Sequence, residues 1–445
     1  MGQVLGKCLR PGEAGSGCDG GTAKSASSLI AEGVPLQPHV PHADVAAMQT
    51  EIHELKAELG QLRGALASVN TGGGGPILGL SQPPKAAILF ERVQHIPLLM
   101  NTGPHHGQEE GEPDKYVGIP NFREDFAARV ELVKEALLRA ETLADKDPKT
   151  LKIFTLPEFF FRGPQGAYSL QDTLGDAYHT ESFIFQLQIL LADARWESWL
   201  GVFGTIIACY IAPGKKMLHN VYNMCLCQQG GFGRNASERG SKCQFVLKHW
   251  ISSVDFLDGG GPADQGKVGF DDERWLENHQ QHYLDGLRAY GRLQDSCLLR
   301  YGGVSIGLEI CLDHLESRLR NNEATRVYQH DRPVEIQLVI SSGMSFDDEA
   351  MVVARPGGLA FINDGTGCND GALDTRTDAR LYSDKTTYER ITPRLVPAFP
   401  DMTPEKADLL SSLFCMEDDS VPTEPMLAVY PVLKITDYDN EGACQ

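Results

Sequence analysis

The chain has 445 residues, of which 42% are hydrophobic, and its formal net charge is −20. A chain of this size can bury a large core, whereas its acidity disfavours nucleic acid as a partner, because phosphate binding needs clustered Lys and Arg. No run approaches the roughly 18 apolar residues of a membrane-spanning helix, and the N-terminus lacks the apolar region of a secretory signal. We therefore expect a cytoplasmic protein.

Residues 1–42 are rich in Gly, Ala, Ser and Pro, a composition that predicts a flexible tail. Its first residues, MGQVLGKC, place Gly2 after the initiator Met, as N-myristoylation requires, and Cys8 close enough for a second acyl chain. Gly6 departs from the Ser or Thr that this motif favours. One myristoyl chain binds membranes only marginally, so stable anchoring needs Cys8 acylation or nearby positive charge. The tail predicts either peripheral membrane attachment or an unmodified start.

Residues 43–70 carry apolar side chains at alternating spacings of three and four. This heptad pattern predicts a short coiled-coil helix. In a parallel dimer, Glu51 would face Lys56 and Glu58 would face Arg63, so pairing between identical chains is expected. The alternative is an amphipathic helix packed on its own chain.

Residues 71–85, rich in Gly and Pro, predict a flexible linker. From residue 86 to 445, short apolar strands alternate with helical stretches, which is typical of one large α/β domain. The predicted strands are AAILFERV, LKIFTL, WLGVFGTIIACYI, NVYNMCLCQ, CQFVLKHW, GGVSIGLEI, IQLVISS, GLAFIN and MLAVYPVLKI.

Eleven cysteines are spread through the chain, which indicates reduced thiols rather than a disulfide framework. Cys225 and Cys227 lie in an apolar, strand-like run with the wrong spacing for a zinc knuckle. His279 and His282 have no companion Cys or acidic motif. Neither pair predicts a metal site.

Three predicted strands end on residues that can share one site. LKIFTL is closed by Pro157 and followed by Glu158, Lys248 ends CQFVLK, and Cys311 follows VSIGLEI. In open α/β sheets, ligands bind at the carboxyl ends of strands. Taken singly these signals are weak, because a Cys after an apolar strand is more often a buried small hydrophobe.

Together, and in this order, the segments resemble the nitrilase superfamily of carbon–nitrogen hydrolases. LPEFF is similar to the family's general-base segment, VLKHW to its lysine segment and VSIGLEICLDH to its nucleophile segment. VYN, with Asn223, and IQLVISSGMS also fall where the family has similar segments. The resemblance covers residues 85–435 in short motifs rather than in continuous similarity.

The resemblance implies a four-layer α-β-β-α sandwich that works without a cofactor or a metal. Cys311 would be the nucleophile, Glu158 the general base and Lys248 the cationic group near the oxyanion, with the backbone N–H of Leu312 as a second donor. Physical chemistry agrees, because a nearby ammonium favours the reactive thiolate and a carboxylate held close accepts the thiol proton.

The stretch between Lys248 and Cys311 is longer than the family pattern. It contains RWLENHQQHYLDGLRAYGRL, whose apolar residues follow one helical face, so we expect a helix that acts as a lid or as surface elaboration. The insertion also hides the second glutamate that many family members place after the lysine. Asp255 is the nearest acidic side chain and the candidate for that role.

Glu309 is a second departure. In VSIGLEIC, strand alternation puts Glu309 on the same face as Cys311, roughly 7 Å along the strand. Glu309 is expected either to face the pocket, with Lys248 as its partner, or to form a structural pair with another cation.

The sequence thus predicts a homo-oligomeric hydrolase that cleaves a small carboxamide or N-carbamoyl substrate through a cysteine thioester. CLD after the strand is more similar to amidase and carbamoylase members than to the C-W-E of true nitrilases, so nitrile hydrolysis is the alternative chemistry. From a different class, the alternative is a catalytically silent, membrane-tethered scaffold. An intact set of Glu158, Lys248 and Cys311 argues against the scaffold.

Overall fold

The computed structural model describes residues 89–104, 116–175, 182–210, 219–250, 292–294, 297–321, 333–416 and 423–436. All of them belong to one compact unit, Ala87–Gln445. The predicted tail, coiled-coil helix and linker, with Gly2 and Cys8, lie outside the described residues. So do Asp255 and most of the helix expected after Lys248, whose last residues instead begin strand β8 (Arg292–Gln294).

The larger of two sheets has eleven strands, and its main path runs in the order β15-β16-β1-β2-β4-β6-β5-β3. At its centre, β1 is parallel to β2 and β2 is parallel to β4. Strand β17 also pairs with β1, and β7 joins β6 to β8. The bounds are β1 (Arg92–Leu99), β2 (Thr150–Thr155), β3 (Tyr168–Ser169), β4 (Trp199–Val202), β5 (Ile206–Tyr210), β6 (His219–Gln229), β7 (Cys243–Leu247), β15 (Arg394–Pro397), β16 (Met426–Val429) and β17 (Leu433–Lys434).

The smaller sheet has six strands in the order β14-β13-β12-β11-β10-β9. Its central strands β10, β11 and β12 are parallel, so their carboxyl ends lie at one edge. The bounds are β9 (Leu298–Tyr301), β10 (Val304–Ile310), β11 (Ile336–Ser341), β12 (Leu359–Asp364), β13 (Thr377–Tyr382) and β14 (Tyr388–Arg390).

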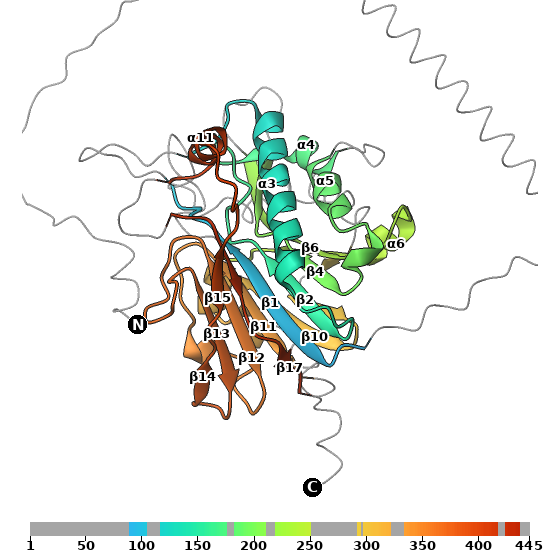
Figure 1. The fold of residues 1–445 in the computed structure, drawn as a ribbon, viewed down its shortest axis with the longest axis vertical. Helices are drawn as coiled ribbons and strands as arrows, with labels where there is room; N and C mark the ends of the chain where they lie inside the picture. Colours follow the sequence, from blue (N-terminus) through green and yellow to red (C-terminus); the bar gives the residue numbers. More distant parts are fainter. Residues whose placement is uncertain are drawn as a thin grey trace, which may run out of the picture. The chain divides into compact units, whose positions relative to one another are not determined.

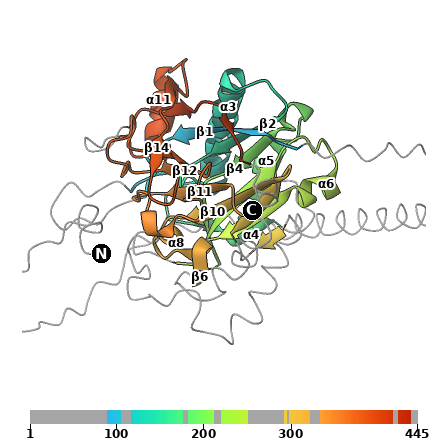
Figure 2. The same cartoon turned by 90° about the horizontal axis from the view of Figure 1, so that it is seen from below.

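The two sheets face each other across a shared apolar core. Val93 and Leu99 of β1 belong to the same buried cluster as Ile306 and Leu308 of β10. The ring of His95, also in β1, lies 4.7 Å from the ring of Phe361 in β12. Because side chains alternate along a strand, the other face of each sheet needs separate cover. Figure 2 shows β10, β11 and β12 next to β1, with α3 and α8 on opposite sides of the two sheets.

Helix α3 (Phe122–Leu143) covers the outer face of the larger sheet (Figure 1). It begins after Asn121, whose side chain accepts from the backbone N–H groups of Arg123 and Glu124 and so satisfies donors of the first turn. Its buried apolar side chains pack in one cluster with residues of β1 and β2, and they include Phe126, Val130, Val133 and Leu137.

Shorter helices complete the cover of the sheets. The outer face of β10 is packed by α9 (Arg318–Asn321), which follows α8 (Leu312–Leu315). A Cβ at Gly307 of β10 would lie 2.3 Å from Leu319 Cδ2 of α9, so a larger residue there would force the Leu319 side chain to shift. The remaining helical segments are α4 (Leu170–Leu174), α5 (Phe183–Ile189), η1 (Ala194–Trp196), α6 (Ala236–Ser241), η4 (Asp348–Ala350) and α11 (Pro404–Leu413).

These elements confirm the prediction of a mixed α/β domain. Within the described ranges, no helix combines the length and the apolar character needed to cross a bilayer. The cysteines in the same ranges are free.

Candidate active site

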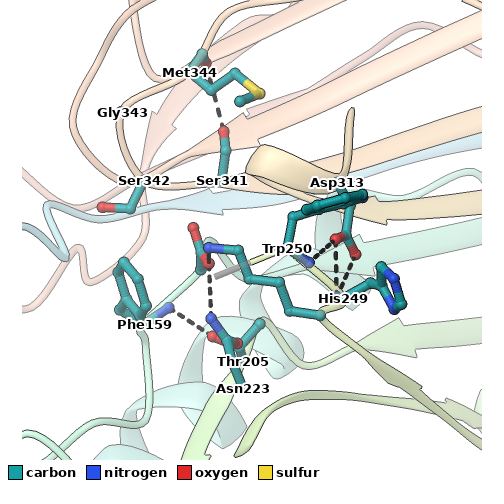
Figure 3. Close-up of polar contacts among 12 residues, drawn as sticks. Phe159, Thr205, Asn223, His249, Trp250, Asp313, Ser341, Ser342, Gly343 and Met344 are labelled. Carbon is teal, nitrogen blue, oxygen red and sulfur yellow. Dashed lines mark hydrogen bonds and ion pairs between the residues drawn. The ribbon is translucent and has the colours of Figure 1, made fainter. Parts of the chain in front are cut away.

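Glu158 follows the end of β2 and is fully buried. Its backbone N–H donates to the carbonyl of Ser341, the last residue of β11, at 3.2 Å. Its own carbonyl accepts from the Thr102 hydroxyl at 2.6 Å. The next residue, Phe159, has a φ of 61° and donates its N–H to Thr205 Oγ1 at 2.9 Å (Figure 3). Glu158 is therefore fixed at the carboxyl end of its strand by bonds to several segments.

Lys248 follows β7 and reaches the Glu158 carboxylate. Its Nζ donates to Glu158 Oε1 at 2.9 Å, and both side chains are fully buried. Asn223 of β6 donates its Nδ2 to the same oxygen at 2.8 Å, and its carbonyl accepts the Lys248 N–H at 2.9 Å. A buried ion pair is costly to break, because a lone charge cannot regain its hydration. The structure thus brings two of the predicted residues into direct contact.

Cys311 lies at the turn between β10 and α8. Its φ of 48° and ψ of −113° are unusual for a residue with a Cβ, and such conformations cost on the order of 1–3 kcal/mol. The Cys311 N–H donates to the carbonyl of Ile340 in β11 at 2.9 Å. Leu312 is the first residue of α8, so its N–H has no acceptor within that helix. The turn places Cys311, which is 6% exposed, at the same strand ends as Glu158.

The backbones of Glu158 and Cys311 are attached to adjacent residues of β11, Ser341 and Ile340. Lys248 joins them through its bond to Glu158. Glu158 and Lys248 come from the larger sheet and Cys311 from the smaller one, so the facing of the two sheets creates this arrangement.

Asp313 connects the Cys311 turn to the segment after Lys248. Its carboxylate accepts the N–H groups of His249 at 2.9 Å and of Trp250 at 2.8 Å (Figure 3). Burial raises the pKa of Asp313, whereas the Arg318 guanidinium at 2.7 Å and the two N–H donors act against that rise. Asp313 was not predicted as a site residue. The available signal was its place in CLD, two residues after the cysteine.

Asp364 fixes the loop after β11 and was also not predicted. Its Oδ1 accepts from the Ser341 hydroxyl at 2.8 Å and from the N–H groups of Gly343 at 2.6 Å and Met344 at 3.1 Å. Since Ser341 also accepts the Glu158 N–H, Asp364 supports the backbone on which Glu158 rests. A carboxylate directly after the strand GLAFIN was the signal for it.

Glu309 does not pair with Lys248. Its Oε2 accepts from His314 Nδ1 at 2.7 Å and from Gln337 Nε2 at 2.8 Å, and its Oε1 accepts the Leu319 N–H at 2.8 Å. Of the two alternatives predicted for Glu309, the pair with Lys248 is wrong, and Glu309 makes structural hydrogen bonds whose side-chain partners are His314 and Gln337 rather than a Lys or Arg. The expectation of a face shared with Cys311 is corrected because strand geometry ends at Ile310, before the left-handed turn at Cys311.

In the part of the chain that the structure describes, no three His, Cys, Asp or Glu side chains gather in a way that could hold a metal ion. What the site offers is a thiol, a carboxylate, an ammonium and the N–H of a helix start. Groups of this kind suit nucleophilic acyl transfer, in which a base activates a nucleophile and fixed donors stabilise an oxyanion.

No family model matches the sequence, and no curated protein matches it. The search of solved structures returns proteins of the superfamily whose motifs the sequence resembles. Nit3 of Saccharomyces cerevisiae, a member of branch 10 of the nitrilase superfamily, is 13% identical over 78% of this chain and 92% of its own, with a TM-score of 0.34. An amidase from Nesterenkonia sp. is 11% identical over 81% of this chain and 97% of its own, also with a TM-score of 0.34.

Proposed function

We propose that the chain is a carbon–nitrogen hydrolase of the nitrilase superfamily, built on that family's four-layer α-β-β-α sandwich. Its reaction is the hydrolysis of a small carboxamide or N-carbamoyl compound through a thioester on Cys311. The observation that carries the proposal is the buried pair of Glu158 and Lys248, at the strand ends to which the Cys311 turn is also attached.

In the first half of the reaction, Glu158 takes the thiol proton and the Cys311 sulfur attacks the carbonyl carbon of the amide. The carbonyl oxygen becomes an oxyanion, which Lys248 Nζ and the Leu312 N–H stabilise, each such donor being worth about 3–4 kcal/mol. Glu158 then passes the proton to the amide nitrogen. The C–N bond breaks, ammonia or an amine leaves, and the acyl group stays on sulfur as a thioester.

In the second half, Glu158 takes a proton from water as the water oxygen attacks the thioester carbon. The oxyanion forms again against the same donors. The C–S bond breaks, and Glu158 returns the proton to the departing sulfur. The products are the free acid and the original thiol, so one carboxylate serves both steps.

Nitrile hydrolysis is the rival chemistry. A nitrile carbon has no leaving nitrogen before water is added, so a nitrilase releases ammonia only after the thiol and water have both added, whereas an amidase releases ammonia from a primary amide after addition of the thiol alone. Incubation of the full chain with matched amides and nitriles, with ammonia as the readout, distinguishes them. We expect the amide to react at least tenfold faster, and equal or reversed rates would contradict the amidase assignment.

A thiol-labelling experiment tests the proposed site without knowledge of the substrate. Among the solved structures, the Nesterenkonia amidase is described with acrylamide added at its active-site cysteine and, in another form, with butyramide bound. We therefore choose acrylamide as a probe for this chain. Peptide mapping should show Cys311 alkylated at least tenfold faster than the other described cysteines, because in the proposed site the Lys248 ammonium favours its thiolate.

The controls for the labelling are chosen from the described cysteines. Cys243→Ala removes one sulfur from a more deeply buried position of β7 and should leave the fast phase unchanged. Cys311→Ala should abolish it. A fast phase that persists in Cys311→Ala would reject the site and favour the silent scaffold.

We further propose that residues 43–70 drive self-association and that Gly2 and Cys8 carry acyl chains. The support is the self-complementary heptad pattern and the MGQVLGKC start. Deletion of residues 1–75 should reduce the oligomer size measured by light scattering. Gly2→Ala should move the protein from the membrane to the soluble fraction of a eukaryotic cell, and equal fractions would remove the acylation claim.

A further inference from the structure

Lys248 and Cys311 stand on different sheets. Lys248 follows β7 of the larger sheet, and Cys311 follows β10 of the smaller one. In the described ranges no strand pairing joins these sheets, so backbone ladders do not fix the distance between the ammonium and the sulfur. The backbone bond from Glu158 to Ser341 joins the sheets near the site, and side chains that cross between the sheets further constrain this distance.

Two side chains, from α8 and α9, bond to the backbone on either side of Lys248. Arg318 Nη1 donates to the carbonyl of Leu247, the residue before Lys248, at 2.5 Å. Asp313 accepts the N–H groups of the two residues that follow, His249 and Trp250. Asp313 and Arg318 are also paired with each other at 2.7 Å. We name this arrangement the Asp313–Arg318 clamp.

The clamp is well suited to hold a fixed geometry. The Asp313 side chain is fully buried and that of Arg318 is 9% exposed, so their bonds are little weakened by water. Each bond to the Lys248 segment has a charged partner, and charge-assisted bonds are about twice as strong as neutral ones.

The clamp is also part of the nucleophile segment. Asp313 belongs to α8, two residues after Cys311, and Arg318 begins α9 after a sharp turn at Ser317, whose φ is 54°. A shift of the Cys311 turn therefore shifts the clamp, and the clamp carries the backbone of Lys248 with it.

We propose that Asp313 and Arg318 are positioning residues that set the distance between Lys248 Nζ and Cys311 Sγ. This inference rests on the proposed function, because it assumes that the ammonium acts on the thiol and on the oxyanion. Loss of the clamp lets the Lys248 segment move away, so the thiolate and the oxyanion both lose a fixed positive charge.

The pH dependence of Cys311 alkylation by iodoacetamide tests this positioning role without a substrate. In Asp313→Asn, the midpoint of the profile should rise by about one pH unit, because a more distant ammonium favours the thiolate less. The value of kcat for the best amide substrate should fall about 10- to 100-fold with KM changed less than threefold, as for an interaction made in the transition state.

A control variant and a double variant separate positioning from general destabilisation. Asp374 and Arg376 form another buried pair, at 2.8 Å, so Asp374→Asn should lower stability without moving the alkylation midpoint. In a Lys248→Met background, Asp313→Asn should produce no further shift, because the group it positions is gone. Arg318→Lys, which keeps the charge, should shift the midpoint less than Arg318→Met.

Failure of the clamp and failure of the proposed function give different results. A folded Asp313→Asn protein with the wild-type alkylation profile would overturn the clamp, as would a full further shift in the Lys248→Met background. If Asp313→Asn does not fold, the Arg318→Lys and Arg318→Met pair gives the same decision. If Lys248→Met itself leaves the profile unchanged, the role of Lys248 in the proposed function fails instead.

Discussion

The pair of Glu158 with Lys248 and the pair of Glu309 with His314 are both fully buried, yet they lie in different settings. Glu158 stands beyond the end of its strand and accepts from Asn223 and Lys248 at one oxygen, Oε1. Glu309 stands within β10 and accepts at both oxygens. Position relative to the strand end therefore distinguishes a candidate reacting carboxylate from a structural one better than burial or charge does.

The donors of the Glu309 pair support that distinction. His314 Nε2 accepts the Asp347 N–H at 3.1 Å, so the ring proton is on Nδ1, which donates to Glu309. Gln337 and the Leu319 N–H supply further donors from β11 and α9. The Glu309 cluster thus ties three elements of the smaller sheet and its cover together.

The largest expected effect separates the two carboxylates by activity. Glu158→Gln should lower kcat/KM by about a thousandfold or more, because general-base catalysis is lost from both steps. The same exchange at Glu309 should change the rate per folded molecule less than tenfold. Ammonia release, measured at matched concentrations of folded protein, gives the rates of both variants. Comparable losses of activity in the two variants would contradict the proposed difference between Glu158 and Glu309.

A smaller effect on activity is expected when a second carboxylate is placed next to Glu158. Asn223→Asp places a negative charge against Glu158 Oε1 and should raise the pKa of Glu158. The base is active when ionised, so activity on the acidic side should be lost at higher pH than in the wild type. A pH profile of kcat/KM checks this, with Asn223→Ala as the uncharged control. If the acidic limb of the Asn223→Asp profile lies at the same pH as in the wild type, direct contact between residue 223 and Glu158 is contradicted.

Glu309→Gln should act on stability. An amide in place of the carboxylate turns an NH₂ toward donors, and unsatisfied buried groups cost about 1–3 kcal/mol each. The free energy of unfolding in urea should fall by about that amount. A variant as stable as the wild type would show that the Glu309 cluster is not structural.

The smallest expected effect is on the pH dependence of stability, and it comes from the buried histidine His95. His95 lies between the sheets, against Phe361 and Tyr430, and Nε2 meets Thr155 Oγ1 at 3.0 Å. Burial lowers the pKa of His95 from 6.5 to about 3. Between these values the unfolded chain binds a proton that the folded chain does not, so stability falls as the pH falls, by up to about 1.4 kcal/mol per pH unit.

Urea unfolding between pH 4 and 7 measures that slope. His95→Asn removes the titrating ring and should reduce the slope, while it lowers stability at pH 7 through the lost packing. If both proteins lose stability at the same rate with falling pH, other groups are responsible.

Much of the smaller sheet was predictable, because its central strands are short, continuous apolar runs. GGVSIGLEI, IQLVISS and GLAFIN correspond to β10, β11 and β12. Longer predicted strands were wrong in extent. WLGVFGTIIACYI is broken into β4 and β5 at Gly204, where a Cβ would lie 2.2 Å from the Pro157 carbonyl. MLAVYPVLKI is broken before β17 at Pro431, which lacks a ladder donor.

The position of strand β1 was also predicted wrongly. The predicted strand AAILFERV starts before Arg92, whereas β1 runs through Arg92–Leu99 and includes polar residues. His95 is buried there by partners from β2 and β12, which no local pattern indicates.

The candidate site was predicted as far as the order of motifs along the chain allowed. The contact between Glu158 and Lys248 fits that order, since both follow strand ends. The positions of Asp313 and Asp364 after predicted strands were available signals. The bonds that they make were not predictable, because these bonds reach backbone groups that lie far away in sequence or in a loop of no fixed pattern.

The acyl-enzyme offers the most direct test of the central claim. Small carboxamides and N-carbamoyl compounds would be screened for ammonia release, and turnover of the fastest would be quenched in acid. Mass spectrometry should find one acyl group on the peptide that contains Cys311, and Cys311→Ala should show neither adduct nor turnover. An acyl group on another residue, or wild-type turnover by Cys311→Ala, would contradict the account.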